Sequence, residues 1–516
     1  MNQICLYFGS KRQNQNPPPK GFQPQLYVDN SHLAPTDLYF YDFNSVWDVN
    51  DDGEYSIDRE EANTRIDYYP EIYTGRILCT EPKHVENYTK KLIKYESNPG
   101  NGDFAYLRRS YFSAYHEMNY TAKKAKGTFE AYDFFDPEES FLREDSQNHN
   151  PKGIDVIEDM KRHYGFFSWH GHGNPYIISV GSYNDYDSDG KKNSGIYYIS
   201  SCDNTTSKED REYGFTGINR IDNKDYPSIA YSIACITSPF DRYISDNKPY
   251  DNIRFCNAFT IEGDYGGPAF LGNTRFGSVS TSHYLEQSFA KFLADTYIVG
   301  VAECQSKADS PINDYAKLSH NLIGEPEFKM WSNLPQKFND ISIIFENNEL
   351  FMEGNNLMKS RIGLTDFNKS YNFIAYYNEL QKNNVDIQNP IISIWKNNYL
   401  PLILWSPCKQ ELTECKKKLT LTEAVLGLDK VDNESEFFII GNNSDLDLNL
   451  RDKIVLNPGF RLIGNGQLKI KSGGTVKIKG SEIKDNASLM ISAPSAIIDN
   501  GFEIGNGAVM QINVLN

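Results

Sequence analysis

The stretch GFFSWHGHGN, residues 165–174, decides the class of fold predicted for this chain. Its first half is a short apolar run typical of a buried strand, and its second half breaks into two histidines framed by glycines. Two similar apolar runs follow, at 229–234 and 268–271, and helical patterns alternate with the strands. This alternation predicts an α/β domain over residues 1–333, with a mainly parallel sheet covered on both faces.

Two helices are predicted in this domain from apolar residues spaced three or four apart. The first spans 82–95, with Thr80 as its N-cap and one face made of Val85, Tyr88, Leu92 and Tyr95. The second spans 283–295, and its inward face is made of Leu285, Phe289, Phe292 and Leu293.

The pattern changes after residue 333, where helical periodicity gives way to alternation. Apolar segments at 341–345, 372–377 and 400–405 are separated by turns rich in Asn and Gly, which predicts an immunoglobulin-like β-sandwich over 334–405. The polar stretch that follows, 406–445, is predicted to be a linker.

The last segment, 446–516, contains a repeat. PGFRLIGNG and NGFEIGNGA share their glycine spacing, and they place Phe460 and Phe502 at positions 42 residues apart. Short strands between glycines at this spacing predict a small stacked C-terminal β domain that carries no catalytic group.

Bulk composition excludes several classes of protein. The 516 residues include 52 basic and 69 acidic side chains, and the net charge of −17 repels phosphate backbones, so no nucleic-acid partner is expected. The eight cysteines include no CxxC spacing, which argues against a structural zinc site. They are also too sparse for a disulfide scaffold. No run of about 18 apolar residues occurs, so no membrane span is expected.

Two strand ends carry residues that can do chemistry. SWHGHGN ends one strand with His170 and His172, and SIAYSIACITSPFD ends another with Cys235. Taken singly, each has an ordinary interpretation, as a satisfied or metal-binding histidine and as a small buried cysteine. Parallel strands end at one edge of a sheet, and a nearby imidazole can take the proton of a thiol, so together they predict a Cys–His dyad.

The order of motifs around this dyad resembles the gingipain family of caspase-fold cysteine peptidases, from about residue 3 to residue 332. The resemblance is carried by APTDLYFYDF and WDVNDDGEYS within 34–56, YYPEIYTGRILCTEPKHVENYTKKLIKYE at 68–96, WHGHGN, YSIACITSPFD, GGPAFLGNTRFGS at 266–278 and NLIGEPEFKMW at 321–331. The Gly-His-Gly of the family's catalytic histidine selects His172 over His170.

The resemblance implies a caspase-like sheet and a cysteine endopeptidase that hydrolyses peptide bonds through a thioester on Cys235, with His172 as general base. The main-chain N–H groups of Gly173 and Cys235 would form the oxyanion hole, and Glu117 would orient the imidazole. A solvated surface carboxylate is the alternative for Glu117. The resemblance also implies protein or peptide substrates, no required cofactor, and a secreted or cell-surface protein.

The chain departs from the family at its start and between the two dyad residues. It begins near ICLYFG, so the further α/β subdomain, the signal and the pro-segment that usually come first are expected to be missing. An insertion rich in Asp and Asn is expected at 183–212. Two other functions stay open: a sortase-type transpeptidase, which passes the thioester to an amine, and a non-catalytic surface protein that uses its β modules for adhesion.

Two acidic loops have the alternating oxygen ligands of a calcium site and a glycine at the turn. Their ligands are Asp48, Asn50 and Asp52 in the first loop, and Asp185, Asp187 and Asp189 in the second. The twelfth position is Arg59 in the first loop and Ile196 in the second, which excludes an EF-hand. Two interpretations stay open for these loops: a solvated turn rich in Asp and Asn, and a looser structural calcium site.

Overall fold

The computed structural model divides the chain into two compact units, residues 1–334 and 335–516. It describes residues 25–27, 33–47, 66, 68–146, 150–186, 192–203, 216–240, 253–339, 341–346, 349–367, 372–380, 390–405, 411–412, 415–427 and 438–515.

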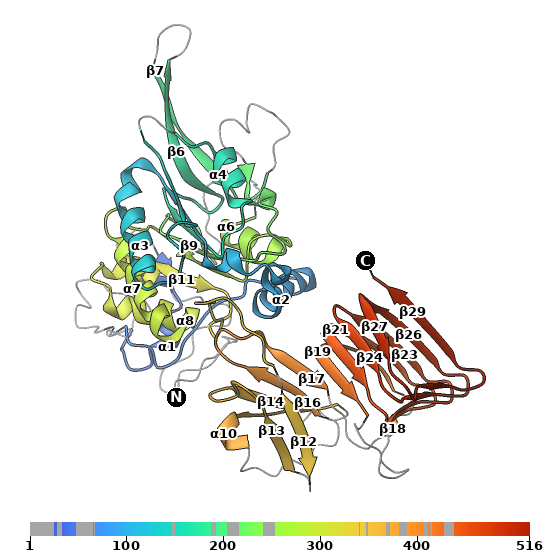
Figure 1. The fold of residues 1–516 in the computed structure, drawn as a ribbon. Helices are drawn as coiled ribbons and strands as arrows, with labels where there is room; N and C mark the ends of the chain where they lie inside the picture. The colour runs from blue at the N-terminus through green and yellow to red at the C-terminus, as the bar shows by residue number, and fades with distance from the viewer. Residues whose placement is uncertain are drawn as a thin grey trace. The chain divides into compact units, whose positions relative to one another are not determined.

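A six-stranded sheet forms the middle of the first unit (Figure 1). Its order is β11-β10-β9-β5-β3-β4, with bounds Ser110–Ala114 for β3, Phe141–Glu144 for β4, Phe166–His170 for β5, Ile229–Ser232 for β9, Ala269–Asn273 for β10 and His320–Ile323 for β11. Every pairing is parallel except that of β10 with β11. The mainly parallel sheet predicted from the apolar runs is therefore confirmed.

Helices cover both faces of this sheet, as predicted. One face packs against α3 (Asn119–Ala131), α7 (Ser282–Thr296) and α8 (Val299–Asp309). The other face shares an apolar cluster with α4 (Gly153–Met160), α6 (Phe255–Asn257) and the π-helix η6 (Ala258–Glu262). The remaining elements of the unit include β1 (Gln25–Tyr27), β2 (Leu33–Pro35), α1 (Leu38–Tyr41), α2 (Pro82–Ser97) and α9 (Asp314–Ser319). Among the helices that the structure describes, none is both long and apolar enough to cross a bilayer.

The first predicted helix is observed as α2, but its buried face differs from the expected one. Thr80 lies outside the helix and is not its N-cap. Val85 is 53% exposed, whereas Tyr88 is buried together with the polar Asn87 and Lys91. The side chains of Asn87 and Lys91 donate hydrogen bonds to main-chain carbonyls of η6. These two polar residues therefore belong to the buried face, and apolar periodicity cannot identify them.

The second predicted helix is confirmed as α7. Leu285, Phe289 and Leu293 are buried, as expected, while Phe292 is only partly buried at the border of the packed face. The same face also buries Glu286, a residue that periodicity alone assigns to solvent.

The insertion between the two strand ends contains a long hairpin. β6 (Ile177–Tyr186) pairs antiparallel with β7 (Lys192–Ser200), and β7 pairs parallel with the short β8 (Thr216–Gly217). In Figure 1 this hairpin extends away from the central sheet. Residues 204–215 of the insertion lie outside the described part of the chain.

The second unit begins with antiparallel strands. β12 (Ser342–Glu346) pairs with β13 (Glu349–Glu353), and a second ladder contains β15 (Asn372–Tyr376), β14 (Arg361–Asp366), β16 (Pro390–Trp395) and β17 (Leu402–Trp405) in that order, with the short helix α10 (Tyr377–Leu380) after β15. Met352, Ile362 and Ile394 belong to one buried cluster between them. The strands predicted for 334–405 are present, and the immunoglobulin-like class stays a prediction.

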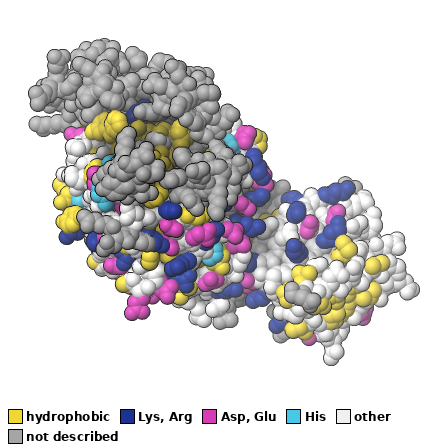
Figure 2. Space-filling model, turned by 90° about the horizontal axis from the view of Figure 1, so that it is seen from above, with side chains coloured by type: hydrophobic (Ala, Val, Ile, Leu, Met, Phe, Trp, Pro, Cys, Tyr) yellow, Lys and Arg dark blue, Asp and Glu magenta, His cyan; other side chains and the backbone are white. Residues whose placement is uncertain are grey.

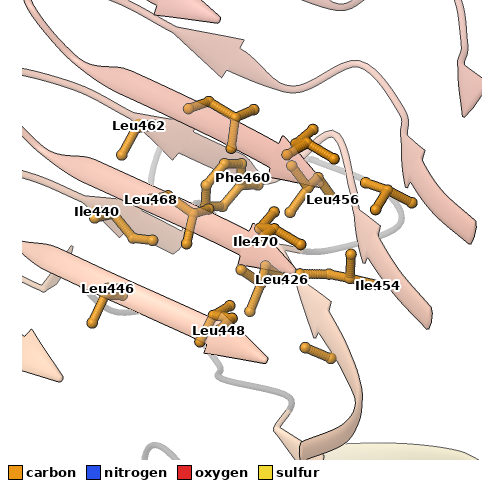
Figure 3. Packing of buried hydrophobic residues seen from close by; sticks show 14 of the residues in the cluster. Leu426, Ile440, Leu446, Leu448, Ile454, Leu456, Phe460, Leu462, Leu468 and Ile470 are labelled. Carbon is orange, nitrogen blue, oxygen red and sulfur yellow. The ribbon is translucent and has the colours of Figure 1, made fainter. Parts of the chain in front are cut away.

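The remainder of the second unit is a parallel β-solenoid. One ladder contains β19 (Lys416–Leu426), β21 (Asp445–Leu456), β23 (Gln467–Ser472), β26 (Ser488–Ala493) and β29 (Val509–Val514), with β24 (Thr475–Ile478) and β27 (Ser495–Ile498) beside it. A second ladder contains β18 (Glu411–Leu412), β20 (Phe438–Ile440), β22 (Phe460–Leu462), β25 (Glu482–Ile483) and β28 (Glu503–Ile504). Leucine, isoleucine and phenylalanine side chains from successive coils fill the space between the ladders (Figure 3).

The register of the solenoid explains the repeat in the sequence. Gln467 pairs with Ser488, and Ser488 pairs with Val509, so one coil takes 21 residues here. The spacing of 42 between Phe460 and Phe502 therefore corresponds to two coils. The repeat recognised in the sequence is twice as long as the structural repeat.

The linker predicted for 406–445 is not what the structure contains, because β19 and β20 lie within this range. β19 pairs parallel with β21 along its length and with β17 at its end, so the antiparallel ladder continues into the solenoid. The lysines at the start of β19 are exposed, and its inward side chains, such as Leu421 and Leu426, are buried. The run of exposed charge hides the alternation, which is why composition indicated a polar linker.

Candidate active site

The two predicted dyad residues lie at the same edge of the central sheet. β5 and β9 are adjacent and parallel, with Trp169 opposite Ser232. His172 follows the last residue of β5 by two positions, and Cys235 follows the last residue of β9 by three. Neighbouring strand ends thus bring together residues that are 63 positions apart, as expected for a parallel sheet.

His172 contacts the carboxylate proposed from the sequence. Its Nε2 lies 3.3 Å from Oε2 of Glu117, which follows β3 in a short 3-10 turn, η4 (His116–Met118). The main chain of His172 is fixed by Ser179, whose Oγ accepts its N–H at 2.7 Å and whose N–H donates to its carbonyl at 2.8 Å. The ring of Tyr115 packs edge-on against the imidazole at 5.2 Å between centroids. The side chain of His172 keeps 45% exposure, so a substrate can reach it.

Cys235 is partly buried, and burial raises the pKa of its thiol above the usual value. The main-chain N–H of Gly277 donates to its sulfur at 3.4 Å. The next residue, Ile236, has φ of 55° and donates its N–H to the carbonyl of Arg275 at 2.6 Å. A left-handed backbone at a β-branched residue is strained, and such strain persists where the surrounding contacts hold a functional turn in place.

Gly173 lies directly against the cysteine turn. A Cβ atom at this position would lie 2.8 Å from the carbonyl oxygen of Cys235, 2.9 Å from Cβ of Ala234 and 3.1 Å from Cγ2 of Thr237. Only a residue without a side chain lets the histidine loop and the cysteine turn approach this closely. Neither main-chain N–H, that of Gly173 or that of Cys235, donates to another residue in the described part of the chain.

His170 occupies a different environment from His172. Its side chain is fully buried, with Nε2 3.0 Å from Oε2 of Glu286 and Nδ1 3.0 Å from Oγ1 of Thr121. β5 ends at His170, so the chain leaves the sheet before His172 and carries that side chain to the surface. The structure therefore separates the two histidines into a buried residue and an accessible one.

The residues proposed for calcium fall outside what the structure describes. Asp48, Asn50, Asp52, Asp187 and Asp189 belong to undescribed segments, and Asp185 is placed in β6 without a described side chain. Over the described ranges, no group of three or more His, Cys, Asp or Glu side chains is arranged to hold a metal ion.

Several contacts of the site were not predicted from the sequence. Ser179 and Tyr115 carry no motif that marks them as partners of His172. Gly277 lies in GGPAFLGNTRFGS, which carried the family resemblance, yet nothing in that stretch indicates a contact with the cysteine sulfur.

Comparisons with known proteins concern the family and the fold. The model of peptidase family C25 matches residues 5–331. The crystal structure of the Arg-specific cysteine proteinase gingipain R is similar at 11% identity and a TM-score of 0.46, covering 66% of this chain and 75% of that one. The complex of the pro- and mature domains of RgpB from Porphyromonas gingivalis has 12% identity and a TM-score of 0.46, covering 67% and 79%. No curated protein sequence matches significantly.

Proposed function

Because this chain belongs to peptidase family C25, a family of gingipain-like cysteine peptidases, we propose that it is an endopeptidase with Cys235 as nucleophile and His172 as general base. The observation that supports these roles is the contact set around Gly173. This glycine holds the histidine loop against the cysteine turn, and His172 in turn contacts Glu117.

In the proposed reaction, the Cys235 thiolate adds to the scissile carbonyl carbon and forms a tetrahedral oxyanion. The main-chain N–H groups of Gly173 and Cys235 donate to this oxyanion. His172, which carries the proton taken from the thiol, gives it to the leaving amine as the C–N bond breaks and a thioester remains. Water then attacks the thioester while His172 takes its proton, and the acid product leaves as the thiol is restored.

Glu117 is proposed to orient the imidazole of His172. This role matters because burial raises the pKa of Cys235, so the thiol on its own is mostly protonated at neutral pH. Pairing with a positively charged imidazole favours the thiolate, and the carboxylate of Glu117, 3.3 Å from Nε2, is placed to hold that imidazole in position.

The test measures which cysteine reacts and whether cleavage depends on it. We expect iodoacetamide at pH 7 to label Cys235 faster than any other cysteine, and His172→Ala to remove this advantage. Cys235→Ala should abolish cleavage of fluorescently labelled casein, while Cys202→Ala, a change at another partly buried thiol, should leave it intact. Casein cleavage that survives Cys235→Ala would rule out the proposed nucleophile.

The sortase alternative uses the same residues and differs only in the acceptor of the acyl group. A labelled amine added during casein cleavage separates the two reactions, because a transpeptidase yields a conjugate as its main product. The non-catalytic alternative predicts that Cys235 reacts no faster than Cys256 or Cys304, where burial raises the pKa of each thiol to about 12.

Proteins or peptides are the substrates that membership of a peptidase family implies. Nucleic acid is not expected as a partner, since the net charge is −17 and acidic and basic side chains are interspersed on the face seen in Figure 2. Secretion or cell-surface attachment, and structural calcium in the two acidic loops, are further parts of the proposal. Fractionation of the source cells tests the first of these.

A further inference from the structure

One face of the central sheet carries a row of buried polar side chains. Ser168 of β5 pairs with Tyr231 of β9, and His320 begins β11 at the far side of the same face. Two glutamates from the covering helices lie over this row, Glu286 from α7 and Glu303 from α8, and both are at most 1% exposed. Burying a carboxylate costs free energy unless polar partners compensate it, so both glutamates are expected to have such partners.

Hydrogen bonds connect the ring of His170 to Thr121 and, through Ser168, to Glu286. The hydroxyl of Thr121 donates to the carbonyl of Met118 at 2.7 Å, so its oxygen accepts the Nδ1–H of His170. The hydroxyl of Ser168 donates to Oε1 of Glu286 at 2.7 Å. Nε2 of His170 lies 3.1 Å from this Oγ of Ser168, which therefore links the ring to the carboxylate, and 3.0 Å from Oε2 of Glu286.

The same histidine holds the turn that carries Glu117. The carbonyl of His170 accepts the N–H of Tyr115 at 2.8 Å, at the start of the turn. Its side chain reaches the end of the turn through Thr121, which binds the carbonyl of Met118. Glu117 lies between these two anchors, so the position of its carboxylate relative to His172 depends on where the His170 ring is held.

Glu286 connects this turn to the loop that contacts the cysteine. α7 begins at Ser282, only five residues after Gly277, whose N–H donates to the Cys235 sulfur. The first turn of α7 is tied to this loop, because Ser278 donates its N–H to Oγ of Ser282 at 2.8 Å and accepts the N–H of Ser282 on its carbonyl at 3.1 Å. Glu286 lies one turn further along the same helix.

We propose that Glu286 and His170 form a positioning pair for the dyad proposed above, on whose function this inference rests. The pair fixes the Glu117 turn through His170 and the Gly277 loop through α7. It thereby fixes the distance between His172, which contacts the turn, and Cys235, which contacts the loop. Neither residue touches substrate. Loss of the pair lowers turnover because aligned reacting groups are needed, while substrate binding is left in place.

Glu303 offers a matched control within the same row. It is equally buried and contacts a histidine at the same kind of distance, with Oε1 2.9 Å from Nδ1 of His320. Its carboxylate also lies 3.6 Å from Nζ of Lys307. None of these contacts involves the turn at 115–118 or the loop at 277–282, so Glu303 has the burial and chemistry of Glu286 without its connection to the dyad.

The experiment compares Glu286→Gln with Glu303→Gln on one peptide selected from the casein digest. We expect Glu286→Gln to lower kcat about tenfold or more with KM within about twofold, and to slow alkylation of Cys235 in parallel. Glu303→Gln should lower the melting temperature to a similar extent and leave kcat within about twofold of the wild type. Equal kcat in the two variants would overturn the positioning role.

Thr121→Val keeps the test decisive if Glu286→Gln does not fold. Valine has nearly the shape of threonine but cannot accept the Nδ1–H of His170, so it should lower kcat in the same direction. A Thr121→Val enzyme with wild-type kcat would contradict the inference. Failure of the proposed function is recognised separately, because the wild-type enzyme would then neither cleave casein nor show preferential labelling of Cys235.

Discussion

Replacing Gly173 by alanine tests the geometry of the site most directly. The new methyl group would lie 2.9 Å from Cβ of Ala234, where carbon atoms in contact are normally about 3.5 Å apart. It would also lie 2.8 Å from the carbonyl oxygen of Cys235, which is main chain and cannot turn aside. The histidine loop and the cysteine turn therefore have to separate by roughly 0.6 Å, the difference between these contacts and a normal one.

This displacement should reduce catalysis more than it reduces stability. A misplacement of 1 Å costs on the order of a hundredfold in rate, so Gly173→Ala is expected to lower kcat/KM on labelled casein by about tenfold to a hundredfold. Overpacking a tight site costs about 1–3 kcal/mol of unfolding free energy, which thermal denaturation can follow.

Gly127 supplies the control for this substitution. It lies inside α3, and a Cβ atom there would meet nothing within 4 Å. Gly127→Ala should therefore raise the unfolding free energy by about 0.5–1 kcal/mol and leave cleavage unchanged. A Gly173→Ala enzyme that cleaves casein at the wild-type rate would show that the two loops do not need this approach, and the reasoning about the site would fail.

Three further predictions concern stability. Burial raises the pKa of Glu96 from 4.5 to about 7. Its stabilising contribution is therefore complete below pH 4.5 and is lost as pH rises through 7. Across this range the melting temperature of the wild type should fall relative to that of Glu96→Gln. Ile470 stacks between neighbouring coils and is 2% exposed, so Ile470→Ala should cost about 2–5 kcal/mol in denaturant unfolding, against less than about 0.5 kcal/mol for the exposed Lys471→Ala. If the acidic loops bind calcium, added calcium should raise the melting temperature, EDTA should lower it, and Asp187→Asn should weaken both responses.

The sequence predicted those parts of the fold in which one physical signal acts alone. The strands that end near His172 and Cys235 are buried over their whole length and mostly apolar, because a parallel sheet buries both of its faces. In α2, by contrast, the buried face depends on Asn87 and Lys91, which bond to carbonyls 174 and 168 residues away, and no local pattern records such partners. The solenoid was only half recognised, because a 21-residue coil varies in sequence from one turn to the next and the clearest repeat was two coils long.

The candidate site divides in the same way. Its accessible members, His172 and Cys235, follow strand ends and carry glycine or turn residues around them, so local sequence marks them. Glu286 carries no such mark, because a glutamate in an amphipathic helix is normally solvated. Its buried position arises from a partner 116 residues earlier in the chain, His170, and only the packed structure brings that partner into view.

The two histidines of WHGHGN illustrate how one short motif serves two purposes. In a continuing strand, residues two apart point to the same side, so His170 and His172 would share one environment. The strand instead ends at His170, and Gly171 lies so close to Ser179 that a Cβ there would be 2.2 Å from its carbonyl oxygen. The chain therefore turns between the two histidines, which leaves the first fixed in the buried row and the second free to act at the surface. The glycines thus separate the histidine proposed to position the dyad from the histidine proposed to react.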